Sequence, residues 1–410
     1  MTAEIVVMNR EAVALAADSA MSIGGGQKIL NTANKVFMLA PNYPVGLLIY
    51  NNATLMGVPW EIIIKTYRDF IIDRSTVFSD LEEYAIDFLD YVEKNGTNFV
   101  VSEQESGYFK EMVFSEYGEI MRVMWNSIRD IFYKKAEISE DEIKEIASKT
   151  IKDYHAAWSG WREILPVEKA KEFRKRLRIK FDKEILEIIK SGFEEFELLE
   201  DDLNKLFEIG LFKFSKMEGK LSHTPSPFTG IVFAGYGKDN LFPICVNFDV
   251  YCYLCDTLVF FSEPKRRRGI GFTKEGATSW LIPFAQDDVI QNILNGRLQY
   301  YEVELRNKLS KKLSKKEVES VIENVNREIW KTHTQPIIDT IDVLPKDELA
   351  SVARTLVSLT SFMRRVSSDI ESVGGPIDVA VISKKDGFIW IDRKHYFDIN
   401  KNIHFTREKG

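Results

Sequence analysis

The 410-residue sequence has few of the features that mark secreted, membrane-spanning or disulfide-bonded proteins. Its three cysteines are too few for a disulfide framework in a chain of this length, which favours a reducing compartment. No uncharged apolar run approaches the roughly 18–20 residues that a membrane span needs, and the N-terminus lacks the basic and apolar regions of a signal peptide. These absences predict a cytoplasmic protein that does not enter a membrane.

A basic excess and metal-ligand patterns are also missing. The net charge of −7 argues against a general nucleic-acid binder, which needs positive charge to neutralise phosphates. The basic run at residues 265–268 is most simply the solvated tip of a loop. The five histidines show no ligand spacing, and Cys252 and Cys255 have no second pair to complete a zinc site. The sequence therefore predicts no metal centre and no Ser-His-Asp or Cys-His triad.

Both ends of the chain carry short runs rich in valine, isoleucine, alanine and leucine, separated by turn residues, which is typical of strands. Asp386-Gly387 between two apolar runs indicates a hairpin, and apolar residues at three- and four-residue steps from Asp347 to Phe362 indicate a helix before it. The predicted strands are Ile5–Met8, Ala12–Ala17, Lys35–Leu39, Val45–Tyr50, Ile231–Ala234, Pro243–Asp249, Tyr251–Phe261, Ile377–Ile382 and Phe388–Ile391.

From residue 75 to residue 221 the chain is charged and its pattern is helical. Capping boxes at Ser79–Glu82 and Ser139–Glu142 begin helices, and Val167–Phe214 alternates charged and apolar residues at helical spacing. At about 150 residues per domain the length allows two or three domains, yet no linker rich in proline, glycine or serine divides the chain. We therefore interpret 75–221 as a helical insertion. Two further helices are predicted near Asp287–Leu298 and Lys315–Trp330.

Thr2 follows the initiator methionine and is small enough for Met1 to be removed. Removal would place a free α-amine beside a hydroxyl. An α-amine with an ordinary pKa of about 7.7–8.0 is well suited to take a proton from a hydroxyl nucleophile at neutral pH. By itself a threonine at position two has no catalytic meaning.

Two charged residues support a catalytic role for Thr2. Asp18 ends the second predicted strand, where the start of the first strand would lie alongside in an antiparallel hairpin, and Lys35 opens the third. A lysine beside an α-amine lowers the pKa of the amine, and a carboxylate beside the lysine balances its charge. The same residues also fit a purely structural role, in which Asp18 ends a strand at a turn and Lys35 guards a strand edge.

The segments Thr2–Val7, Ala16–Ala20 and Asn34–Leu39 together resemble the start of proteasome β-subunits and of the related bacterial heat-shock peptidase. The spacing from Thr2 to Asp18 agrees without a gap, and Lys35 requires one inserted residue. Near the other end, Ser368–Val379 looks like the family's Asp-x-x-Ser-Gly-Gly segment, and Phe233–Gly237 is similar to its central Gly-Gly-Tyr strand.

The resemblance implies a mixed α+β fold, the four-layer αββα sandwich of N-terminal-nucleophile (Ntn) hydrolases. Residues 1–74 and 222–410 would build this sandwich, and 75–221 would be inserted into it. The family's pattern implies catalytic roles for five residues and a backbone oxyanion donor at one of two others. The five are Thr2, Asp18, Lys35, Asp369 and Ser372, and the two are Tyr50 and Asn51.

Three segments depart from the family's pattern. The family's Ala-Gly-Ser turn, whose glycine N–H binds the oxyanion, is Tyr50-Asn51-Asn52-Ala53 here. A backbone donor in this turn would still serve, because the oxyanion hole needs an N–H and no particular side chain. The arginine that often follows the family's aspartate is Ala20, and the loop with its Gly-Ser-Gly is read as replaced at residues 283–286.

The resulting hypothesis is an N-terminal threonine peptidase that acts on peptides or unfolded proteins and requires no metal or organic cofactor. The resemblance further implies a homo-oligomer, with a ring as one form, and leaves room for an unfoldase partner. Neither nucleic acid nor membrane is an expected partner. Two alternatives remain: an Ntn amidohydrolase of a small-molecule amide, and an inactive proteasome-like scaffold.

Overall fold

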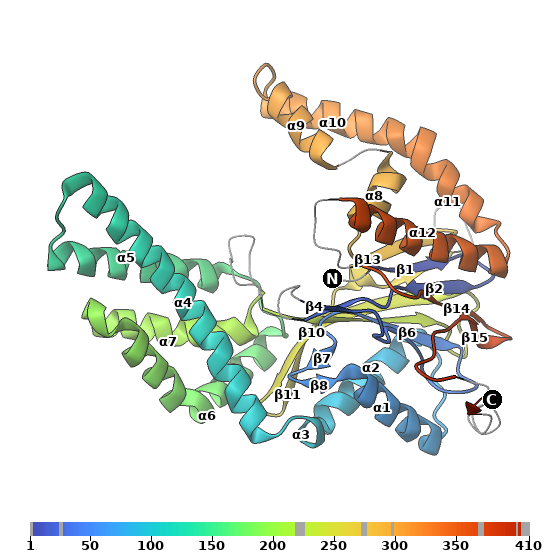
Figure 1. Ribbon diagram of the computed structural model, residues 1–410, viewed down its shortest axis with the longest axis horizontal. Helices are drawn as coiled ribbons and strands as arrows, with labels where there is room; N and C mark the ends of the chain where they lie inside the picture. The colour runs from blue at the N-terminus through green and yellow to red at the C-terminus, as the bar shows by residue number, and fades with distance from the viewer. Residues whose placement is uncertain are drawn as a thin grey trace.

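The computed structural model describes residues 3–23, 28–217, 226–271, 277–296, 299–367, 373–398 and 401–402. In these parts the chain is a mixed α+β protein built on two antiparallel sheets of five strands or more, with many helices (Figure 1). Across the described residues we find no helix whose length and apolar character would let it cross a membrane.

The first sheet joins the two ends of the chain. Its strands, in spatial order, are β13 (Trp280–Ala285), β1 (Ala3–Met8), β2 (Val13–Ala17), β14 (Asp378–Ser383) and β15 (Gly387–Asp392). β2 pairs on one side with β1 and on the other with β14, about 360 residues later in the chain. The predicted hairpins at both ends are thereby confirmed, and they form one sheet.

The second sheet uses the middle strands of the sequence. In spatial order these are β11 (Thr257–Phe261), β10 (Ile244–Leu254), β9 (Thr229–Gly235), β6 (Val45–Asn51) and β5 (Val36–Met38), with β12 (Arg268–Gly269) paired to β10. Two short two-stranded pairs complete the strands: β3 (Met21–Ile23) with β4 (Lys28–Leu30), and β7 (Thr54–Leu55) with β8 (Val58–Pro59).

Alternation along β1 shows how the sheets are covered. Ile5 and Val7 face a cluster shared with helices, whereas Val6 and Met8 face a cluster shared with Leu48 of the second sheet. α12 (Lys346–Val366), α11 (Gln335–Asp342) and α8 (Asp288–Asn295) supply the first cluster. On the far face of the second sheet, α1 (Trp60–Arg74) and α2 (Leu81–Lys94) form a third cluster.

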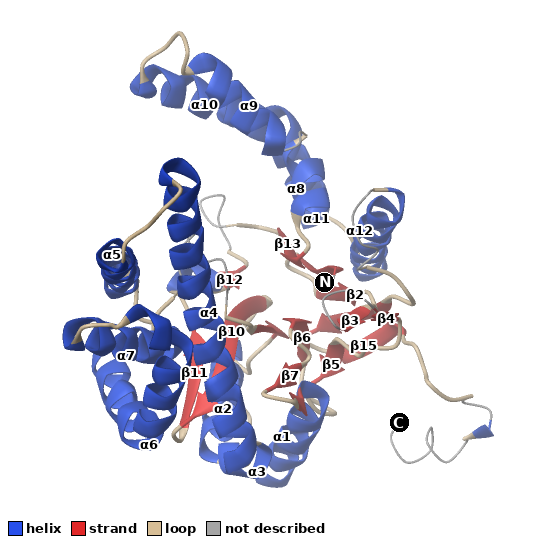
Figure 2. Cartoon of the chain, turned by 60° about the vertical axis from the view of Figure 1, so that its left-hand side comes forward, coloured by secondary structure: helices blue, strands red, loops and turns tan. Residues whose placement is uncertain are grey.

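The remaining helices form a lobe and an arm (Figures 1 and 2). The lobe contains α4 (Ser102–Lys135), α5 (Glu140–Gly160), α6 (Val167–Phe193) and α7 (Glu200–Ser215), and follows the one-turn α3 (Gly96–Phe99). Its core stacks Phe109 on Phe181, with ring centroids 4.0 Å apart, and extends onto Cys252 and Val259 of the second sheet. The arm contains α9 (Gln299–Leu309) and α10 (Lys315–Ile329), and a π-helical turn, Trp330–Thr334, connects it to α11.

Three local predictions were wrong. β10 does not end near Val250 but passes through a bulge between Val250 and Cys252, so that the turn falls after Leu254. The first capping box uses Asp80 and Glu83, one residue later than predicted. Residues 283–285 do not form a loop but belong to β13, which pairs with β1 at the edge of the first sheet. An edge strand tolerates Pro283, because N–H groups on its outer side have no partner strand to bond.

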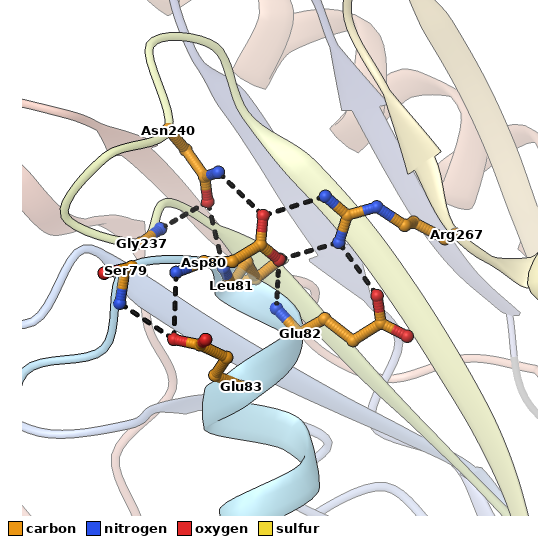
Figure 3. A network of polar contacts seen from close by, with 8 residues as sticks. All are labelled: Ser79, Asp80, Leu81, Glu82, Glu83, Gly237, Asn240 and Arg267. Carbon is orange, nitrogen blue, oxygen red and sulfur yellow. Dashed lines mark hydrogen bonds and ion pairs between the residues drawn. The ribbon is translucent and has the colours of Figure 1, made fainter.

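The basic run at residues 265–268 is anchored to the protein, contrary to the expectation of a solvated tip. Both terminal nitrogens of Arg267 donate to the carboxylate of Asp80 at 2.7 and 2.8 Å, and one also reaches Glu82 (Figure 3). Asp80 in turn accepts from the N–H of Glu82 and from the side chain of Asn240, both at 2.9 Å. Asp80 thus connects the N-terminus of α2 to two loops of the second sheet, one through Arg267 and the other through Asn240.

We expect Asp80→Ala to lower the free energy of unfolding by about 1–2 kcal/mol, because the helix loses its cap together with its ion pair. Arg267→Ala leaves the cap in place and should cost less, about 0.5–1 kcal/mol. The hydrogen bond from Arg267, followed by those from Asn240 and Glu82, lowers the pKa of Asp80. The contribution of Asp80 is therefore complete above about pH 4 and is lost as the pH falls further. Urea unfolding at pH 7 and pH 3 measures both effects; equal costs for the two variants at pH 7 would contradict this assignment.

Candidate active site

Asp18 lies directly after β2 and is almost completely buried. Its Oδ1 accepts hydrogen bonds from the backbone N–H of Ala3 at 3.0 Å and from Lys35 Nζ at 2.6 Å. Its Oδ2 accepts from the backbone N–H of Ala20 at 3.1 Å and of Gly374 at 2.9 Å. One carboxylate thus binds the start of β1, the chain after β2, the second sheet and the C-terminal segment.

Lys35 reaches Asp18 from the other sheet. It precedes β5, its backbone carbonyl accepts the N–H of Ile49 in β6 at 3.0 Å, and its side chain crosses to the end of β2. Only 7% of the Lys35 side chain and none of the Asp18 side chain is exposed. Burial lowers the pKa of Lys35, and the neighbouring carboxyls of Asp18 and Glu4 act in the opposite direction. The pair is a charged contact held between the sheets, away from solvent.

The segment that follows residue 372 is hydrogen-bonded to the residues directly after β2, Asp18 and Ser19. Besides the bond from Gly374 to Asp18, the N–H of Ser19 donates to the carbonyl of Gly374 at 3.1 Å, and the Ser19 hydroxyl donates to the carbonyl of Pro376 at 2.6 Å. Gly375 has φ of 77°, a left-handed conformation that glycine adopts without strain. The described part of the predicted Ser-Gly-Gly segment therefore lies beside Asp18.

Glu4 is a further charged residue of this region, and sequence reasoning missed it. It lies on β1 between Ala17 and Phe284 of the neighbouring strands, is completely buried, and shares the inter-sheet face of Val6. Burial raises the pKa of the Glu4 carboxyl well above its ordinary value, and the charge of Lys35 acts against this shift. A glutamate among the apolar residues of β1 was the signal that could have identified it.

Tyr50, on β6, lies over the neighbouring strand. Its ring occupies the space that a Cβ on Gly230 would need, since that atom would lie 1.9 Å from the Tyr50 Cζ. The ring also packs against Phe284 of the first sheet, with centroids 5.4 Å apart, and the hydroxyl donates to Asp249 at 3.4 Å. Burial, and then the charge of Asp249, raises the pKa of Tyr50. The ring therefore connects the two sheets close to Glu4.

The turn after β6 is left-handed at Asn51, where φ is 65°. The Asn52 side-chain carbonyl accepts the N–H of Thr54 at 3.2 Å, and the Asn52 backbone carbonyl accepts the hydroxyl of Thr229 at 2.8 Å. The left-handed conformation at Asn51 is one that asparagine tolerates better than most residues other than glycine.

Of the predicted site residues, the structure brings Asp18 and Lys35 into direct contact and places Tyr50 and Asn51 at the end of β6. Thr2, Asp369 and Ser372 lie outside the described residues.

No protein-family model matches the chain, and no curated protein matches it. Among solved structures, the chain is similar to an Anbu (Gly-1) mutant from Hyphomicrobium sp. strain MC1, with 10% identity and a TM-score of 0.31, over 99% of this chain and 93% of that one. It is also similar to Anbu (ancestral beta-subunit) from Yersinia bercovieri, with 10% identity and a TM-score of 0.31, over 98% and 93% of the two chains. A third match is the helical assembly of the Anbu complex from Pseudomonas aeruginosa, with 8% identity and a TM-score of 0.30, over 100% and 96%.

At identities of 10% or less and TM-scores near 0.3, the likeness carries no information about chemistry.

Proposed function

We propose that the protein is an N-terminal threonine hydrolase of the proteasome-like Ntn class, and that it cleaves peptide bonds. The observation that supports this most directly is the buried ion pair of Asp18 and Lys35 at the start of β1, where the N–H of Ala3 also donates to Asp18. A buried ion pair is costly and contributes little net stability, so a purely structural role explains it poorly.

The proposed mechanism begins with removal of Met1. The Thr2 hydroxyl attacks the scissile carbonyl while the Thr2 α-amine takes the hydroxyl proton and then delivers it to the leaving amine. Water resolves the acyl ester and regenerates Thr2. Lys35 lowers the pKa of the α-amine and stabilises negative charge, Asp18 holds Lys35, and Asp369 and Ser372 orient the amine.

For the oxyanion we favour the backbone N–H of Asn51 over that of Tyr50. Alternate residues of a strand direct their N–H groups to opposite edges, and Ile49 directs its N–H to the carbonyl of Lys35. The N–H of Asn51, two residues further along β6, points to that same edge, past the residue at which β5 begins. The N–H of Tyr50 points toward β9. A donor on the Lys35 side would meet a carbonyl held beside Lys35.

The fold supports this proposal through its layers. A hydrophobic cluster lies between the sheets, and another covers the outer face of each, which supports a four-layer αββα sandwich. We propose that residues 1–74 and 222–410 form the catalytic sandwich, although α2, inside 75–221, packs on the second sheet beside α1. The helical lobe would be the inserted part. Peptides or unfolded proteins are the proposed substrates and a homo-oligomer the proposed assembly, with an unfoldase as a further partner.

Intact-mass spectrometry together with turnover of fluorogenic peptides tests this function. We expect the active protein to lack Met1, Thr2→Ala to lose turnover to the background of the assay, and Thr2→Ser to retain part of it. Thr355→Ala, which alters an exposed threonine of α12, is the matched control and should turn over like the unaltered protein. Retained Met1 in an active preparation, or undiminished turnover by Thr2→Ala, would exclude the mechanism and favour a scaffold.

A further inference from the structure

Glu4 is a buried carboxyl for which neither the fold nor the mechanism above provides a role. The residue is 0% exposed, and neither of its carboxyl oxygens has a hydrogen-bond partner among the described residues. An ionised carboxylate without donors in such a place is very unfavourable. Asp18, one strand away, shows the contrast, because its two oxygens accept four hydrogen bonds.

The position of Glu4 makes it part of the Lys35 environment. Glu4 pairs across the strands with Ala17, the residue before Asp18, and faces the space between the sheets. The Lys35 side chain crosses that space to reach Asp18, and the charges of Lys35 and Glu4 act on one another. The charge of the buried Lys35 ammonium therefore acts on two carboxyls: Asp18, with which it forms a hydrogen bond, and Glu4, with which it forms none.

The two carboxyls have different surroundings. Asp18 holds the ammonium with the help of three backbone donors, whereas Glu4 has apolar neighbours. Paired titratable groups whose environments differ in this way separate into a charged and a neutral member. The neutral member is Glu4, whose pKa burial raises.

We propose that Glu4 is a positioning residue that acts through Lys35: as the pH rises, the Glu4 carboxyl gives up its proton to water before the Lys35 ammonium does. The new negative charge then lies beside that ammonium and stabilises it. The effect on peptide turnover rests on the proposed function, but the coupling of Glu4 to Lys35 does not.

None of the other described groups around Glu4 takes the place of Lys35 as the cation that the Glu4 charge would stabilise. Asp18, directly after β2, acts on Glu4 through its charge and already accepts a hydrogen bond from the Lys35 ammonium. Tyr50 faces Glu4 from β6 and keeps its proton, because burial and Asp249 raise its pKa. On β13 the paired neighbour is Phe284, which does not titrate. Further away, the positive charge of Lys394 lowers the pKa of Lys35, and Lys394 itself forms an ion pair with Asp378 on β14.

Nuclear magnetic resonance of isotopically labelled lysine side chains tests the coupling directly. The Lys35 signal is assigned by its loss in Lys35→Met and is followed against pH in the unaltered protein and in Glu4→Gln. We expect the pKa of Lys35 to fall by about one unit in Glu4→Gln, because the charge that supports the ammonium is gone. Glu11→Gln, an exposed carboxyl on the turn of the same hairpin, is the matched control and should leave the Lys35 titration unchanged.

The pH profile of peptide turnover is the second readout. Normalised to its own maximum, the alkaline limb in Glu4→Gln should move to lower pH by the same amount as the pKa of Lys35. A purely structural role of Glu4 would change the amount of folded protein and leave this limb in place. Glu4→Met, of similar length, serves if Glu4→Gln does not fold.

The two proposals fail in different ways. An unchanged Lys35 titration in a folded Glu4→Gln protein overturns the role of Glu4, whatever the activity. A shifted Lys35 titration in a protein that cleaves no peptide overturns the proposed function and leaves the coupling intact.

Discussion

Asp18→Ala is expected to lower the free energy of unfolding by about 3–5 kcal/mol, because it leaves the buried Lys35 ammonium without its partner. Three backbone N–H groups, those of Ala3, Ala20 and Gly374, lose their acceptor at the same time. The loss combines an unpaired buried charge with unsatisfied donors. Urea unfolding at neutral pH measures it, provided that the unfolding slope stays the same.

A double-mutant cycle separates the two parts of this cost. Adding Lys35→Met to Asp18→Ala removes the unpaired charge, so the double variant should be more stable than Asp18→Ala alone. Glu168→Ala is the exposed counterpart, since Glu168 pairs with Lys171 on the surface of α6. That change should cost about 0.3–0.5 kcal/mol. A double variant no more stable than Asp18→Ala would show that the lost hydrogen bonds, and not the charge, dominate.

Gly235→Ala should lower the free energy of unfolding by about 3 kcal/mol. Gly235 ends β9 with φ of 139°, a conformation that other residues rarely adopt, and an added Cβ would lie 2.0 Å from the carbonyl oxygen of Pro44. That oxygen also accepts the N–H of Tyr236 at 2.9 Å. Because the obstacle is backbone, no side-chain rotation relieves it, and the β6–β9 end of the second sheet has to move.

Gly269 provides a matched control within the same sheet. Both glycines pair with Ile244 of β10, Gly235 from one side and Gly269 from the other. Among the described residues, a Cβ on Gly269 would meet Ile244 alone, at 3.9 Å, which is an ordinary contact. Gly269→Ala should therefore change the urea midpoint very little, and equal losses in the two variants would refute the steric explanation.

Much of the fold could be predicted because the buried strands have simple patterns. β2 is a continuous apolar run and β1 is apolar apart from Glu4, and the hairpin they form places Asp18 next to the start of β1, as predicted. The bulge in β10 could not be predicted, since Val250 and Cys252 are as apolar as the residues around them. What decides such a bulge is the packing of the sheet.

The candidate site was only partly predictable, for a related reason. Asp18 and Lys35 were identified from their spacing and from a family resemblance, whereas Glu4 matches no motif. Its importance appears only when burial and missing partners are known. The role of Arg267 was missed because its partner Asp80 is distant in sequence, and charge runs are usually solvated.

The four bonds to Asp18 also set the time at which the site can form during synthesis. Ala3 and Ala20 leave the ribosome early, but Gly374 and the strand β14 that completes the first sheet follow about 350 residues later. The helical lobe and the arm are made in between. A nascent or truncated chain that ends before residue 374 therefore has an incomplete first sheet and an Asp18 without all its donors. Under the proposed function, an unfinished chain would therefore lack a complete site until Gly374 and β14 have been made.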